Sequence, residues 1–149
     1  MTDLTKSKTR VDEHGEVFTP TYIVKEMLDL LPPGILNDPS KTFLDPTCGN
    51  GNILVTILEE RLMLGLDPLL SVSTLYGIDI QEDNVQDTKD RLIKLVPQAK
   101  SIINKHIRCM DILEWQKNPS SPLVDWEIDG DWPEKLDAPS VHDVNSDFF

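Results

Sequence analysis

The segment 43–52 (Phe-Leu-Asp-Pro-Thr-Cys-Gly-Asn-Gly-Asn) joins a short apolar run to a glycine turn and then to a helical pattern. Gly49 and Gly51 allow a sharp turn and a close ligand approach, because neither carries a Cβ atom. The following helix begins with backbone N–H groups that lack intrahelical partners and can bind an anion. Asp45 could bind an ammonium group, directly or through water. The segment predicts one corner of a site for a nucleotide-like ligand.

Two further aspartates follow apolar runs and could complete such a site. Asp79 lies 28 positions after Gly51 and can accept hydrogen bonds from both hydroxyls of a ribose. Asp111 can accept from an adenine amino group, while Ile80 and Ile112 can lie on the two faces of the ring. One glycine pair or one strand-terminal aspartate more often belongs to an ordinary loop or a solvated strand end. The prediction therefore depends on the three features occurring in order, each after its own strand.

The elements that must position these residues alternate along the chain. Apolar residues at helical spacing predict helices over residues 20–31, capped by Thr19, and over 52–64 and 84–95. Apolar runs predict strands over residues 42–45, 75–80 and 107–112, with Ile102 and Ile103 leading into the last, and a connector over 65–73. This alternation is typical of βαβ units. The predicted fold class is α/β, with a truncated, mainly parallel sheet and helices on both faces.

The composition agrees with a single globular domain. The chain has 149 residues, of which 39% are apolar and 27% charged. No apolar run approaches the roughly 20 residues that span a bilayer, and the amino terminus is too polar for a secretory signal. Cys48 and Cys109 form no disulfide or metal pattern, which favours a reducing cytoplasm. The histidines, His14, His106 and His142, are scattered, so no metal site is predicted.

The charged residues are unevenly distributed along the chain. The net charge is −12, and residues 112–149 hold nine acidic and two basic residues, or −7 of that total. We divide the chain into a flexible amino-terminal arm (1–17), a ligand-binding domain (18–115) and an acidic, partly irregular tail (116–149). The simplest interpretation of the tail is a solvated segment. A surface that meets a basic partner, or that mimics DNA, is the sharper alternative.

Four segments resemble motifs of the adenine-specific (N6) DNA methyltransferases, which include the modification subunits of restriction systems. Residues 15–20 (Gly-Glu-Val-Phe-Thr-Pro) resemble the amino-terminal Phe-Thr-Pro motif, and residues 45–51 the Asp-Pro-x-Cys-Gly-x-Gly motif that binds S-adenosylmethionine (SAM). Residues 76–80 resemble the ribose-binding strand, and residues 110–113 more weakly the adenine-binding motif. Together they cover residues 14–113 and imply a Rossmann-like class I SAM-dependent methyltransferase fold.

The resemblance also implies which residues hold the cofactor. It implies that Phe18 and Thr19 close over the cofactor and that Asp45, Cys48 and Gly49 hold its methionine part. It also implies that Asp79 and Ile80 hold the ribose and adenine and that Asp111 holds the adenine amino group. We interpret Cys48 as a small lining residue and not as a nucleophile. By resemblance the protein is a site-specific adenine methyltransferase located in the cytoplasm of a prokaryotic or phage-infected cell.

The catalytic motif of that family is absent from the sequence. It consists of Asn, Asp or Ser followed by Pro-Pro and an aromatic residue, and it holds the target amine and stacks on the flipped base. Here Asn118-Pro119 continues with two serines, and Pro32-Pro33 continues with Gly34. No catalytic residue is therefore assigned. The chain is expected to be the SAM-binding part of a DNA-modification system.

Functions from different classes stay open. In the first, a second protein chain supplies the catalytic and target-recognition parts of an adenine methyltransferase. In the second, the protein is a catalytically inert binding or regulatory protein, of phage or mobile-element type, that engages a protein partner such as a host protein through its scaffold and acidic tail. Methylation of a small molecule or a protein, and homo-oligomerisation, also stay open. DNA binding by this acidic chain alone is not expected, because DNA-binding proteins usually carry a basic face.

Overall fold

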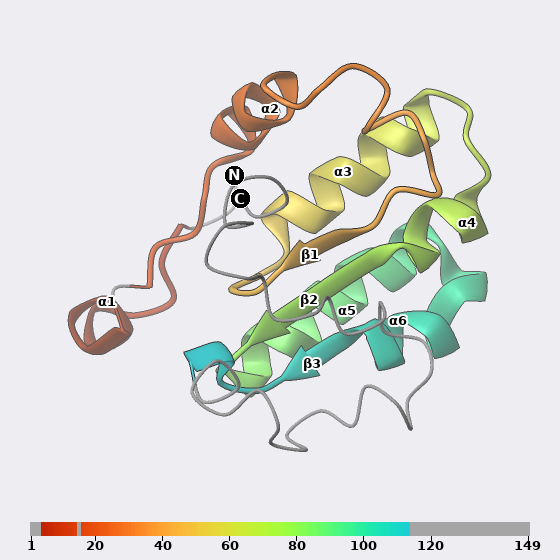
Figure 1. The fold of residues 1–149 in the computed structure, drawn as a ribbon. Helices are drawn as coiled ribbons and strands as arrows, with labels where there is room; N and C mark the ends of the chain where they lie inside the picture. The colour runs from red at the N-terminus through yellow and green to blue at the C-terminus, as the bar shows by residue number, and fades with distance from the viewer. Residues whose placement is uncertain (1–3, 15, 114–149) are drawn as a thin grey trace.

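Three short parallel strands form the centre of the protein in a computed structural model, which describes residues 4–14 and 16–113 (Figure 1). In chain order the elements are α1 (Lys8–His14), α2 (Thr21–Asp29), β1 (Phe43–Asp45), α3 (Asn52–Met63), α4 (Pro68–Ser73), β2 (Leu75–Asp79), α5 (Glu82–Leu95), the 3₁₀ helix η1 (Pro97–Ala99), α6 (Lys100–His106) and β3 (Ile107–Cys109). Among these described elements, no helix has the length and apolar character needed to cross a membrane.

The sheet has the order β1-β2-β3, and both neighbouring pairs are parallel. Leu44 lies opposite Tyr76, and Ile78 lies opposite Arg108. The predicted α/β character and the parallel sheet are therefore confirmed. Within the described residues β1 pairs with β2 alone and forms one edge of the sheet. The carboxyl ends of β1 and β2 consequently lie side by side.

Helices α3 and α5 pack on one face of the sheet, in contrast to the prediction of helices on both faces. Phe43, Leu75 and Ile107 point into the main core with α3, α5 and α6, whereas Tyr76 and Ile78 belong to a separate cluster. Figure 1 shows α3 and α5 on the same side of the strands. The reason is topological: both βαβ crossovers are expected to be right-handed and step in the same direction, so their helices share a face.

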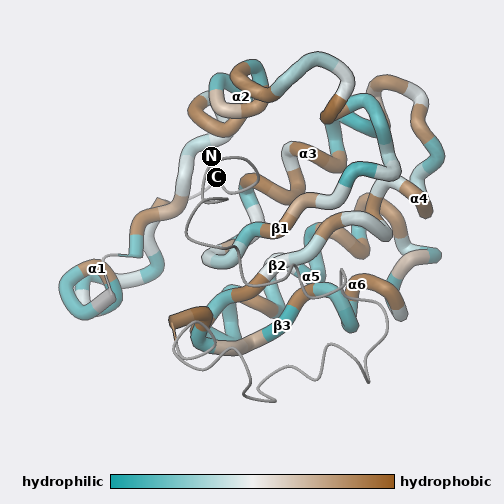
Figure 2. The backbone as a smooth tube through the Cα atoms, in the orientation of Figure 1, coloured by the Kyte–Doolittle hydropathy of each residue, from teal (hydrophilic) through white to brown (hydrophobic). Residues whose placement is uncertain are grey.

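Helix α3 is buried around most of its surface, because it packs between α2, α5 and the sheet. Figure 2 shows it as mainly hydrophobic, and Leu54, Ile57 and Leu58 are almost fully buried. It also approaches the strand backbone closely at Gly77. A Cβ atom there would lie 2.8 Å from the Leu54 Cδ1 atom, so a larger residue would push α3 away from the sheet.

The predicted connector over residues 65–73 contains a helix. Asp67 caps α4 by accepting a hydrogen bond at 2.8 Å from the backbone N–H of Leu70, and Pro68 occupies the first turn. This Asp-Pro pair is a typical helix start. The helix has only six residues, too few for an apolar period to be visible in the sequence.

Two other sequence predictions were wrong in detail. Ile102 and Ile103 belong to α6 and not to a strand; Ile103 is buried in the core, and adjacent isoleucines suit either element. Thr19 does not cap α2, because the residue before that helix is Pro20 and no side chain caps it. Residues 8–14, in the segment predicted to be a flexible arm, form α1. The division into three parts stays a prediction, and the tail over 116–149 lies outside the described residues.

The buried guanidinium of Arg61 joins the segments that lead into the first two strands. Its nitrogen atoms donate to the carbonyl groups of Leu36, Asp38, Lys41 and Ser71 and to the Thr74 hydroxyl, at 2.7–3.2 Å. The group also lies 5.1 Å from the centre of the Phe43 ring. Burial lowers its pKa to about 10, which leaves the side chain charged at neutral pH. One side chain of α3 therefore fixes the entry to both strands.

We predict that Arg61→Met lowers the free energy of unfolding by at least about 3 kcal/mol, because several carbonyl groups lose a charged donor. Urea unfolding followed by far-ultraviolet circular dichroism measures the change. Lys94→Met is the matched control, since it removes a positive charge from an exposed position on α5 and should change stability by less than about 0.5 kcal/mol. Similar stabilities of the two variants would contradict the prediction.

Candidate functional site

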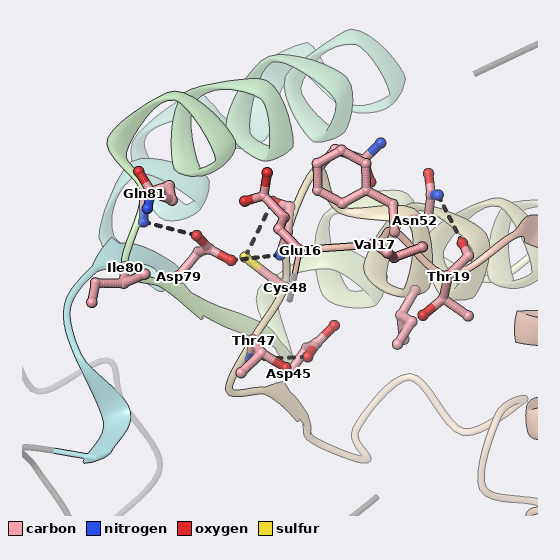
Figure 3. Close-up of a pocket in the computed structure, with 14 residues that line it drawn as sticks. Glu16, Val17, Thr19, Asp45, Thr47, Cys48, Asn52, Asp79, Ile80 and Gln81 are labelled. Atoms are coloured by element: carbon pink, nitrogen blue, oxygen red, sulfur yellow. Dashed lines mark hydrogen bonds between the residues drawn. The ribbon is translucent and has the colours of Figure 1, made fainter. Parts of the chain in front are cut away.

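A cavity of about 320 Å³ opens at the carboxyl ends of β1 and β2 (Figure 3). Asp45 and Asp79, the last residues of these strands, both line it. The structure brings seven of the ten sequence-predicted site residues to this cavity: Phe18, Thr19, Asp45, Cys48, Gly49, Asp79 and Ile80. The segment before α2, the turn after β1 and the turn after β2 thus meet at one place.

The turn after β1, residues 46–51, which we call the glycine loop, has the conformation that its glycines permit. Gly49 and Gly51 have φ angles of 55° and 90°, which residues with a Cβ atom rarely adopt. A Cβ atom on Gly49 would lie 2.9 Å from the Phe18 ring, and one on Gly51 would lie 3.0 Å from Thr88. Gly51 does not line the cavity, so its contribution is to the backbone turn and to the start of α3.

The Asp79 carboxylate holds the loop and the start of α5 in place. Its oxygens accept hydrogen bonds from the backbone N–H groups of Gly49 at 3.0 Å and Gln81 at 2.8 Å, and from the Asn84 amide at 3.2 Å. A carboxylate offers about four acceptor positions, so the donors among the described residues leave about one for a ligand hydroxyl. Asp79 therefore builds the site as well as lining it.

Asp45 differs from Asp79 because it is buried with fewer donors. One oxygen accepts a hydrogen bond from the Thr47 N–H at 3.2 Å, and the other has no partner in the described part of the chain. Burial raises the pKa of Asp45 to about 6, the Thr47 hydrogen bond opposes this shift, and the charge of Asp79 adds to it. The unpaired oxygen is available to a cationic group in the cavity.

The Cys48 thiol is not activated for nucleophilic attack. Burial, together with the negative charge of Asp45, raises its pKa far above the usual range for cysteine. The thiol lies 3.8 Å from the Thr88 hydroxyl, beneath the glycine loop. A protonated, buried thiol favours the interpretation of Cys48 as a packing and lining residue.

The end of β3 lies apart from the cavity. Asp111 accepts a hydrogen bond from the Leu113 N–H at 2.9 Å, and Ile112 packs near Tyr76 and Ile78; neither lines the cavity. Their contacts with an adenine ring stay a prediction. Over residues 4–14 and 16–113, no three or more His, Cys, Asp and Glu side chains gather as a metal-binding group.

Comparison with known proteins gives this site a family context. A family model described as N-6 DNA methylase matches residues 4–93, which include β1, β2, the glycine loop and the segment before α2. The chain belongs to the N-6 DNA methylase family. The family resemblance found in the sequence is therefore confirmed.

The Type II methyltransferase M.VspI of Vibrio sp. (strain 343) is 34% identical over 100 residues. The match covers 66% of this chain and 22% of that enzyme, so the chain spans about a fifth of the length of this relative. No solved structure matches the chain significantly.

In this N-6 DNA methylase chain, sequence reasoning missed the side chains that support the loop from α5. Asn84, Thr88 and Arg91 follow one another at helical spacing on the helix face that meets the glycine loop. Thr88 donates to the Gly49 carbonyl at 2.9 Å, and Arg91 donates to the Asn52 side chain at 2.7 Å. Polar residues at this spacing, next to a glycine motif, are the signal that could have revealed them.

We predict that Asp45→Asn is more stable than the natural protein at neutral pH, by up to about 3 kcal/mol. The folded-state pKa of about 6 lies above the ordinary aspartate value of 3.8. The protonated Asp45 carboxyl stabilises the folded state fully below the unfolded-state pKa of 3.8. This stabilisation is lost as pH rises through the folded-state pKa of about 6. Asparagine does not ionise, so the difference between the two proteins should grow from about pH 4 to about pH 7.

Urea unfolding at several pH values measures this difference. Asp90→Asn is the control, because Asp90 is exposed on α5. The assignment fails if the advantage of Asp45→Asn does not change with pH, or if Asp90→Asn shows the same trend.

Proposed function

We propose that the cavity binds SAM and that the chain is the cofactor-binding part of an adenine-specific DNA methyltransferase with a Rossmann-like class I fold. One observation carries the proposal: the glycine loop, Asp45 and Asp79 line a single cavity at the strand ends of a chain in the N-6 DNA methylase family. That family generally uses SAM. Its SAM motif supplies both Asp45 and the loop.

The side chains of the cavity fit the chemical groups of SAM. The unpaired, buried oxygen of Asp45 suits the methionine ammonium group. The remaining acceptor position of Asp79 suits a ribose hydroxyl, and the half-exposed Ile80 offers apolar surface to the adenine. The first N–H groups of α3, which begins at Asn52 beside the cavity, suit the methionine carboxylate. SAM would supply the electrophilic methyl group, and these residues would hold and orient it.

The sheet order supports the idea of a partial enzyme. Doubly wound nucleotide-binding folds have the strand order 3-2-1-4-5-6 and bind the ligand where the order reverses, beside strand 1. The observed order β3-β2-β1 corresponds to the first half, with the cavity at the end of β1. We propose that further strands join at the edge of β1 that no described strand covers, from the same longer polypeptide or from a second chain.

A second hollow lies beside that edge. It has a volume of about 170 Å³ and a mostly apolar lining that includes Met27, Phe43, Leu44 and Ile57. The added strands would bring the Asn-Pro-Pro-aromatic motif that this sequence lacks, together with the part that recognises DNA. This arrangement is the form of partner that we propose.

A catalytically inert binding protein on the same scaffold is the second candidate, and the missing catalytic motif is the observation that favours it. The two candidates differ in what a complementing chain can do. A methyltransferase part gains activity when the missing part is added, and an inert binder does not.

We predict that the chain binds SAM in isothermal titration calorimetry and that Asp79→Asn weakens binding at least about tenfold, because a carboxylate acceptor and its charge are lost. Asp90→Asn, an exposed change of the same kind on α5, should leave the dissociation constant unchanged. Circular dichroism establishes that both variants are folded. An absence of binding at millimolar SAM would contradict the cofactor proposal.

We predict no transfer of tritiated methyl groups from SAM to DNA by the chain alone, because its sequence lacks the Asn-Pro-Pro-aromatic motif that holds the target amine. Transfer should appear when lysate of the native host, or a chain with the missing motif, is added. The Asp79→Asn variant in the same mixture is the control and should lose most of this signal. Transfer by the purified chain alone would contradict the partial-enzyme proposal, and its absence under all conditions would favour the inert binder.

A further inference from the structure

The residues before Phe18 are tied to the start of α5 by a cluster of opposite charges. We call residues 4–14, 16 and 17 the strap. Lys6 Nζ lies 2.8 Å from an Asp83 oxygen and 2.7 Å from an Asp87 oxygen. Arg10 donates to Asp83 at 3.0 Å through Nη2. The Arg10 hydrogen bonds, assisted by Lys6, hold the pKa of Asp83 well below its usual range, so this carboxylate stays charged.

Glu16 extends this cluster into the cavity. Arg10 Nη2 donates to Glu16 at 2.9 Å, and the Glu16 side chain, of which 11% is exposed, lines the cavity. Figure 3 shows Glu16 above Cys48 and near Asp79. The strap is thus part of the cavity wall.

Asn84 links the strap to the strand-terminal carboxylate. Its fully buried amide donates to Glu16 Oε2 at 2.7 Å and to Asp79 Oδ1 at 3.2 Å. Asp79 in turn accepts from the Gly49 N–H. Glu16, Asn84 and Asp79 therefore form a continuous chain of hydrogen bonds from the strap to the glycine loop.

The backbone continues the same connection. The Phe18 N–H donates to the Leu4 carbonyl at 2.7 Å, and the Thr19 carbonyl accepts from the Asn52 amide at 2.8 Å. The Phe18 ring occupies the space beside Gly49 where a Cβ atom would otherwise lie. Displacing the strap would therefore move the residues that cover the glycine loop.

We infer that docking of the strap and occupation of the cavity are energetically coupled, with Asn84 as the positioning residue that transmits the coupling. The inference rests on the proposed SAM site for its ligand. When the strap is docked, Asn84 is held between two carboxylates and orients Asp79. When it is displaced, Asn84 loses one partner, and one of the donors that orient Asp79 is no longer held in place. Coupling of this kind is reciprocal, so the ligand also stabilises the docked strap.

The first test needs no ligand. Hydrogen–deuterium exchange of the full chain reports the Phe18 amide, which is bonded to the Leu4 carbonyl. Arg10→Ala and Asn84→Ala should each increase its exchange rate about tenfold. Lys25→Ala is the matched control, because it removes an exposed ion pair of 3.8 Å to Glu60, away from the strap. Unchanged exchange in Arg10→Ala, or an equal increase in Lys25→Ala, would overturn the inference even if SAM does not bind.

The second test is a double-mutant cycle on SAM affinity, measured by calorimetry. Arg10→Ala and Asn84→Ala should each weaken SAM binding about tenfold. The double variant should weaken it by much less than the product of the two single effects, because both substitutions break the same chain of hydrogen bonds. Arg10→Lys should restore part of the affinity. The strap ion pairs are partly exposed, so the effect of Arg10→Ala should shrink as NaCl rises from about 0.05 M to about 0.5 M.

The coupling would be overturned if the double variant lost SAM affinity by the product of the two single effects. A loss of affinity in Arg10→Ala that does not depend on salt would also overturn it. If the natural chain binds no SAM while the exchange rates change as expected, the cofactor proposal fails and the strap connection stands. The two proposals therefore fail in different measurements.

Discussion

The arrangement of the site depends on a buried positive charge at the opposite end of the strands. Arg61 satisfies carbonyl groups on both segments that lead into β1 and β2, and the acceptors of its described hydrogen bonds are carbonyl and hydroxyl oxygens, with no carboxylate among them. Because the strands have only three and five residues, a shift at their start would reach their end. The relative positions of Asp45 and Asp79 are thus determined partly from α3.

The two carboxylates of the cavity have different surroundings, and each therefore has a different role. From the described residues Asp79 receives three hydrogen bonds and maintains the loop, whereas Asp45 receives one and keeps a buried oxygen without a partner among them. A buried charge without a partner is unfavourable for folding. The protein tolerates that cost at Asp45, the residue best placed to meet a cationic ligand group.

Local patterns were sufficient to predict β1, β2, α3 and α5, because each has an apolar run or period of its own. The glycine loop and Asp79 were also predictable, since a strand followed by glycines, and then a strand ending in aspartate, are local signals. Asp111 shows the limit of this reasoning. It follows a strand as expected, but β3 lies beyond β2 from the cavity.

The residues that sequence reasoning missed act through distant partners. Glu16 and Asn84 are 68 positions apart, and Arg61 binds the Asp38 and Lys41 carbonyls, which are 23 and 20 positions away, so the spacing of residues within a motif does not reveal these contacts. The short elements were not predicted from the sequence for a different reason. Helix α4 is too short to show a period, and two adjacent isoleucines cannot tell a helix from a strand.

The contrast between the two cysteines has a practical consequence for spectroscopy. Cys48 is buried with a strongly raised pKa, whereas Cys109 is exposed, although partial burial and then nearby carboxylates raise its pKa as well. A maleimide dye at mildly alkaline pH should therefore attach to Cys109 alone. Cys109 lies directly opposite Asp79 in the sheet. The natural chain thus carries a single labelling position one strand away from the cavity, and a fluorophore there would be an optical reporter without any engineered cysteine.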